Sequence, residues 1–89
     1  MEHVVGRIVD VSDHPGARAP SYLLTIDVGG RRVDASVERG SYDRDSLVGR
    51  EVVVALEGGE ATVLAAHSHA SGRVLVTPDR DVDPGTVVS

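Results

Sequence analysis

The sequence predicts an all-β domain, and three features indicate this. Val supplies 17 of the 89 residues, while Phe and Trp are absent. The 10 Gly and 4 Pro residues divide the chain into short runs. Within the clearest runs, apolar residues alternate with polar ones, which is typical of half-buried strands. A chain of this length is expected to form one domain, so we assign residues 1–89 to a single unit.

The first apolar run, Val4–Val11, predicts a long strand that is interrupted at Gly6. A glycine inside a strand often marks a bulge or a sharp bend, so we expect a bend there. The polar stretch 12–20 follows as a loop, and Asp13–Gly16 carries its turn signal.

Residues 22–37 predict a β-hairpin around Gly29-Gly30, a two-residue turn of type I′ or II′. On one face this turn places these apolar pairs opposite each other: Ile26 and Val33, Leu24 and Ala35, Tyr22 and Val37. On the other face it pairs Asp27 with Arg32, and Thr25 with Asp34. Because one register suits both faces, the pairing is well defined.

The stretch Ser41–Gly49 predicts one helical turn, capped by Ser41 and ended by Gly49. A second hairpin follows over residues 52–65 with Gly58-Gly59 as its turn. Its register pairs Leu56 with Ala61, Val54 with Val63, and Glu57 with Glu60.

The remaining segments are a loop at 67–72, a strand at 74–76 and a tail that adds an edge pairing at Val87-Val88. This order predicts a five-stranded OB-fold barrel with one short helical turn between strands 3 and 4. Closing the sheet into a barrel removes exposed strand edges. A small open sandwich is the alternative.

Charge and composition narrow the classes of function. The 14 acidic residues outnumber 9 basic residues, all of them Arg, and the net charge is −5. Nucleic-acid binding must therefore depend on a few local arginines rather than on a basic surface. The chain has no cysteine, which excludes disulfides and thiolate chemistry. No apolar run approaches the ~20 residues of a membrane span, and Met1–His3 does not resemble a signal peptide, so we expect a cytoplasmic protein that does not contact membranes.

Several motifs resemble the tRNA-binding-domain family. They are Val5-Gly6-Arg7-Ile8-Val9, the Ala-Arg-x-Pro-x-Tyr stretch at 17–22 and the Ile-Asp-x-Gly stretch at 26–29. The last two are most similar to the CsaA-type branch, which comprises small OB-fold homodimers linked to tRNA binding and to chaperone-like work in protein export. The resemblance continues through Leu47-Val48-Gly49-Arg50 and Pro78-Asp79-Arg80-Asp81-Val82. The sequence departs from the family at Glu57–Glu60, where a tight turn replaces a longer loop.

Five residues form the predicted nucleic-acid-binding set: Arg18, Arg32, Ser36, Arg39 and Arg44. The resemblance puts a basic residue of the binding region at Arg18. A guanidinium can hold a phosphate through two hydrogen bonds. The alternative is that these arginines are solvated or paired with acids, Arg32 with Asp27 and Arg44 with Asp43 or Asp45.

No catalytic site, metal site or cofactor is predicted. The serines lie in no nucleophile motif, and Gly29-Gly30 and Gly58-Gly59 are turns rather than phosphate-binding loops. His67-Ser68-His69 brings two imidazoles close in sequence, but an exposed polar loop is the better interpretation.

The predicted function is a non-catalytic module that binds tRNA or another structured RNA. The alternative is a protein-binding or export-related chaperone-like module, with a polypeptide client, that has lost RNA binding. An accessory domain of a larger complex is a third possibility. The resemblance implies a homodimer, and Leu23, Val4 and Val87-Val88 are candidates for the self-association patch.

Overall fold

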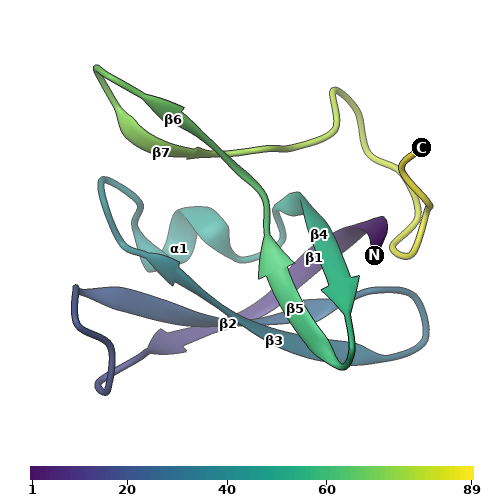
Figure 1. The fold of residues 1–89 in the computed structure, drawn as a ribbon, viewed down its shortest axis with the longest axis horizontal. Coiled ribbons are helices and arrows are strands. Elements are labelled where there is room, and N and C mark those ends of the chain that lie inside the picture. The colour runs from purple at the N-terminus through teal and green to yellow at the C-terminus, as the bar shows by residue number, and fades with distance from the viewer.

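A computed structural model describes residues 1–89, and its main feature is a five-stranded, nearly closed barrel (Figure 1). The strands are β1 (Glu2–Asp13), β2 (Ser21–Asp27), β3 (Arg32–Glu38), β4 (Glu51–Glu57), β5 (Glu60–Val63), β6 (Ala65–Ser68) and β7 (Gly72–Leu75). The barrel order is β3-β2-β1-β4-β5, and β3 contacts β5 to bring the two edges together. The only helix, α1 (Arg44–Leu47), lies between β3 and β4, as predicted, and is too short to cross a membrane.

Strand β1 serves both halves of the barrel. Its first half pairs with β4 and its second half pairs with β2, both antiparallel. The register shifts between Ile8 and Asp10, so the bulge lies at Val9 rather than at Gly6. Gly6 keeps its register opposite Val52. A Cβ atom at Gly6 would lie 2.5 Å from Cγ2 of Ile26, so the glycine is needed for close packing instead.

Both predicted hairpin registers are confirmed. In the first, Ile26 pairs with Val33, and Gly29 and Gly30 have φ of 93° and 86°, as a type I′ turn requires. In the second, Val54 pairs with Val63 and the like-charged residues flank the turn. Alternating apolar residues therefore fixed both pairings, since a one-residue slip would expose the core face.

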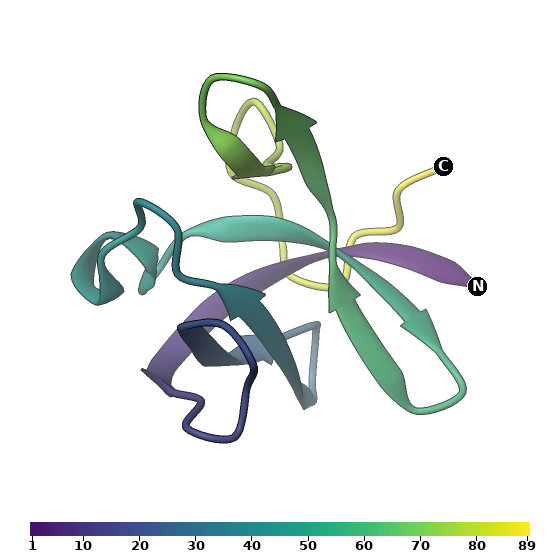
Figure 2. The ribbon, with the colours of Figure 1, turned by 60° about the vertical axis from the view of Figure 1, so that its left-hand side comes forward.

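Two local predictions are wrong. Ser41 does not cap the helix, because the capping position is Asp43 and no side chain there bonds the helix. The expected loop at 67–72 is shorter, because β6 and β7 form a third hairpin in a separate two-stranded sheet. In its turn, Ser68 Oγ accepts hydrogen bonds from the amides of Ala70 and Ser71, both at 3.2 Å. The hairpin projects away from the barrel (Figure 2).

The barrel core is almost entirely aliphatic, as the composition requires. The most completely buried large side chains are Ile8, Leu24, Ile26, Leu47, Val52 and Val54. Leu47 comes from α1, so the helix closes one end of the barrel with a single apolar side chain.

The C-terminal tail returns to β1. Val87 bridges Val4, as the predicted edge pairing requires, and the amide of Val88 donates to the His3 carbonyl at 2.8 Å. Val4 is therefore buried, which removes it from the predicted self-association patch. The tail is also held by Glu51, a buried carboxylate that accepts the amide of Val82 at 2.9 Å.

Replacement of Gly6 by Ala should lower the free energy of unfolding by about 1–3 kcal/mol, since the new methyl group must displace Ile26. Urea denaturation checks this. Gly16→Ala is the matched control, because nothing lies within 4 Å of its Cβ position. An equal loss in both variants would contradict the packing role of Gly6.

Candidate functional site

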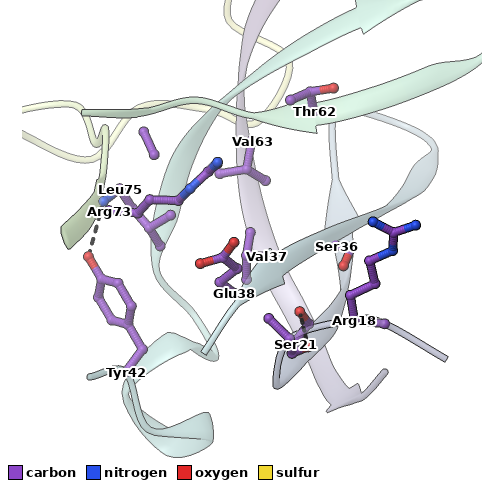
Figure 3. Close-up of a pocket in the computed structure, with 13 residues that line it drawn as sticks. Arg18, Ser21, Ser36, Val37, Glu38, Tyr42, Thr62, Val63, Arg73 and Leu75 are labelled. Atoms are coloured by element: carbon purple, nitrogen blue, oxygen red, sulfur yellow. Dashed lines mark hydrogen bonds between the residues drawn. The ribbon is translucent and has the colours of Figure 1, made fainter. Parts of the chain in front are cut away.

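A groove of about 340 Å³ opens on the side of the barrel between β3 and β5 (Figure 3). Four segments line it. They are the β1–β2 loop at 17–19, the end of β3 at 36–38, the end of β5 at 62–63, and the β6–β7 hairpin through Ala65, Arg73 and Leu75. Ser21 and Tyr42 complete the lining. Segments that are distant in the sequence thus meet at one surface.

The β1–β2 loop, which carries Arg18, is held by short-range bonds. Ser21 Oγ donates to the carbonyl of Ala19 at 2.9 Å, and the carbonyl of Pro20 accepts the amide of Arg39 at 2.9 Å. The first bond closes the end of the loop on the start of β2, and the second attaches it to the residue that follows β3. Arg18 itself is exposed and takes part in no ion pair.

Ser36 faces the groove from β3, and His14 supports it. The Nδ1 atom of His14 lies 2.9 Å from Ser36 Oγ, within hydrogen-bond distance. The sequence analysis identified Ser36 but not His14. The signal was hidden because the pair is separated by 22 positions and meets only when β1 and β3 flank β2.

Tyr42 connects the barrel to the third hairpin. Its hydroxyl accepts the amide of Leu75 at 3.0 Å (Figure 3). Its carbonyl accepts the Tyr22 hydroxyl at 3.1 Å. The Arg50 guanidinium lies over the Tyr42 ring, 5.6 Å from its centroid. Tyr42 therefore fixes the position of β7 and of the groove residues that β7 carries.

The structure brings only part of the predicted set into the groove. Arg18 and Ser36 line it. Arg39 lies over the Tyr22 ring at 5.6 Å and lines an adjoining hollow that shares Glu38 and Tyr42 with the groove.

The other two predicted residues lie elsewhere. Arg32 sits at the far end of β3, beside the turn, and forms no ion pair with Asp27. Asp27 instead accepts the amide of Gly29 at 2.9 Å. Arg44 has an acidic partner, but it is Asp13 at 3.7 Å rather than the flanking acids of its own helix.

Arg73 is a groove residue that the sequence analysis missed. It lies on β7, and the pairing of β7 with β6 in the third hairpin brings it to the groove. Like Arg18, it is exposed and forms no ion pair. With Glu38 as the only acidic lining residue, the groove carries two positive charges against one negative charge. The local balance is therefore opposite in sign to that of the whole chain.

The histidines of the 67–69 segment show no metal geometry. No group of three His, Cys, Asp or Glu side chains lies close enough to hold a metal ion. His67 pairs across the hairpin with Arg73, on exposed backbone.

The fold and the groove define a small OB-fold barrel whose open side carries a groove lined by both apolar and charged residues. No model of a known protein family matches the sequence. The chain is 34% identical over 91 aligned residues to the methionine–tRNA ligase of Thermococcus onnurineus. That alignment covers 91% of the chain but spans only 12% of the ligase.

Three solved structures are similar to this chain over nearly its whole length. A CsaA chaperone protein from Picrophilus torridus is 27% identical with a TM-score of 0.91, covering 99% of this chain and 91% of that one. Chaperone CsaA from Bacillus anthracis shares the fold, with 24% identity and a TM-score of 0.83 over 99% of this chain and 90% of that one. A MetRS-related protein from Pyrococcus horikoshii also shares it, with 13% identity and a TM-score of 0.77 over 99% of this chain and 89% of that one. The predicted resemblance to the tRNA-binding-domain family and its CsaA-type branch is confirmed.

Tyr42→Phe should release the β6–β7 hairpin, because Leu75 loses its hydrogen-bond acceptor. We expect faster hydrogen exchange at the Leu75 amide and a loss of about 0.5–1.5 kcal/mol in unfolding free energy. Thr25→Val is the control, since it removes a β2 hydroxyl that bonds Asp34 and takes no part in the bonds that join Tyr22, Tyr42 and Leu75. Unchanged exchange at Leu75 in Tyr42→Phe would rule out the tether.

Proposed function

We propose that this chain is a non-catalytic module that binds structured RNA, with tRNA as the expected ligand, through the groove between β3 and β5. The observation that carries the proposal is the pair of unneutralised arginines, Arg18 and Arg73, on opposite sides of that groove. The similarity to a segment of a methionine–tRNA ligase supports the choice of tRNA.

The chemistry of the groove supports phosphate contacts. An arginine that is already paired with a carboxylate has less to gain from a phosphate, and Arg7, Arg44 and Arg80 are paired in this way. Arg18 and Arg73 carry no such partner, so their donors are available. Arg39 follows β3 and adds a third arginine beside the groove, in a hollow that Glu38 and Asp43 also line.

One contact at the groove resembles a catalytic pair but lacks the group that would complete it. Ser36 and His14 are hydrogen-bonded, which is the geometry of a nucleophile and a base. However, no carboxylate bonds the other nitrogen of His14, so the imidazole lacks the third group that orients a catalytic base. We therefore assign this pair to ligand contact.

A polypeptide-binding, chaperone-like function is the second candidate. Apolar side chains of Val37, Val63 and Leu75 line the groove, and they would suit an extended apolar segment. The similarity to a CsaA chaperone protein favours this candidate as well. The chain's net charge of −5 opposes polyanions at long range, and RNA binding must overcome it.

We also retain the homodimer as a proposal. Val87 and Val88 are 60% and 42% exposed at the tail edge, and Leu23 is half-buried on the outer face of β2. Light scattering coupled to size exclusion measures the mass directly. A mass of one chain at all concentrations would exclude this dimer.

Labelled tRNA should bind the protein with an affinity that falls as salt rises. In Arg18→Ala, and separately in Arg73→Ala, the log–log salt slope should decrease by about 0.9, the value for one lost phosphate contact. The matched control is Arg31→Ala, which removes the same charge at the β2–β3 turn, outside the groove. Equal losses in all three variants would mean that net charge rather than the groove governs binding.

The second candidate makes a different prediction. A polypeptide-binding groove should suppress the aggregation of an unfolded client protein in molar salt, where charge contacts are screened to ~3 Å. Arg18→Ala should leave that suppression unchanged, because the apolar lining carries the binding. Turbidity of the heated client measures it, and failure with several clients counts against this candidate.

A further inference from the structure

Glu38 is a groove residue that phosphate binding does not explain. It is the last residue of β3, it is exposed, and its carboxylate takes part in no ion pair and no hydrogen bond. Figure 3 shows it pointing into the groove between the sides that carry Arg18 and Arg73. A carboxylate in this position repels phosphate, so it weakens a purely electrostatic site.

The same carboxylate is a strong acceptor for base edges. Guanine presents two parallel donors, N1–H and the 2-amino group, on its Watson–Crick edge, and a carboxylate can accept both at once. Cytosine and adenine each offer one amino donor on that edge. Uracil offers a single N–H between two carbonyl oxygens, which a carboxylate repels. A free carboxylate therefore favours the bases in the order guanine, then cytosine and adenine, then uracil.

The rest of the groove suits one unpaired nucleotide. Its volume of about 340 Å³ lies at the lower end of small-ligand pockets. Val63 and Leu75 give apolar surface for the face of a base, while the flanking arginines are placed for the phosphates on either side. Proteins read RNA sequence mainly at unpaired bases that are turned out from the helix.

We propose that Glu38 makes the groove selective for an unpaired guanine, held by its Watson–Crick edge between Arg18 and Arg73. This inference rests on the proposed RNA-binding function. It adds a sequence preference to a site whose arginines alone would bind any phosphate backbone.

The test uses labelled pentaribonucleotides with the sequence UUXUU, in which X is guanine, inosine, adenine, cytosine or uracil. Fluorescence anisotropy at low salt measures each affinity. We expect guanine to bind roughly tenfold more tightly than uracil, within the range of a bidentate base contact. Inosine keeps N1–H but lacks the 2-amino group, so its affinity should fall toward that of adenine. Equal affinities for all five oligonucleotides would overturn the inference.

Glu38→Gln separates base recognition from general charge. The variant should bind the guanine pentamer roughly tenfold more weakly, because the carboxamide cannot accept two donors. It should bind the uracil pentamer as tightly or more tightly, because one negative charge has been removed. Since Glu38 is exposed and unbonded, the variant should remain folded.

Glu57→Gln is the matched control, with the same chemical change at the β4–β5 turn, outside the groove. Its preference for guanine should equal that of the unaltered protein. If Glu38→Gln strengthens binding to all pentamers equally, Glu38 is only a repulsive charge and the inference is wrong. If tRNA binding still depends on Arg18 and Arg73 in that case, the proposed function stands. If neither tRNA nor any pentamer binds at the lowest salt, both proposals fail.

Discussion

The close packing of β1 between β2 and β4, with which it pairs, is the constraint on which the barrel depends. One strand must pair with β4 through its first half and with β2 through its second half. Gly6 lies where the halves meet, and the space that its side chain would occupy is taken by Ile26 from β2 and Val54 from β4. The bulge at Val9 then turns the strand toward β2. Without these two local features, the strands would form a flatter sheet, and β3 and β5 would not meet.

The geometry of the groove depends on the closure of the barrel between β3 and β5 and on Tyr22 and Tyr42. Tyr22 is buried in the core, and Tyr42 packs against it. Their polar groups form a relay from β2 through the 39–43 loop to the amide of Leu75 on β7. A protein without Phe or Trp thus uses its tyrosines as hydrogen-bonding links between segments. The relay sets where Arg73 stands relative to Arg18.

Some arginines make contacts within the protein, and others have side chains that are free to bind a ligand. Some lie in ion pairs, and others lie over tyrosine rings, where they add packing and cation–π attraction. The two in the groove have neither kind of partner. A chain with a net charge of −5 therefore presents a locally cationic groove, with one carboxylate placed among the cations. Such an arrangement favours selective contact over general attraction, because the long-range field does not help.

The sequence by itself determined the order of the five barrel strands and the helical turn along the chain, the two hairpin registers and the OB-fold class. Alternating apolar residues and Gly-Gly turns act over neighbouring positions, so their consequences can be worked out along the chain. It also predicted Arg18 and Ser36 as binding residues, and both of them line the groove. The third hairpin escaped prediction because its short strands are exposed and carry no clear alternation.

Only the tertiary structure decided which charges meet. It joined His14 to Ser36, paired Arg44 with Asp13, and brought Arg73 and Glu38 to the same groove. These contacts span elements whose relative placement depends on the bend of β1 and the relay through Tyr42, which no local pattern encodes.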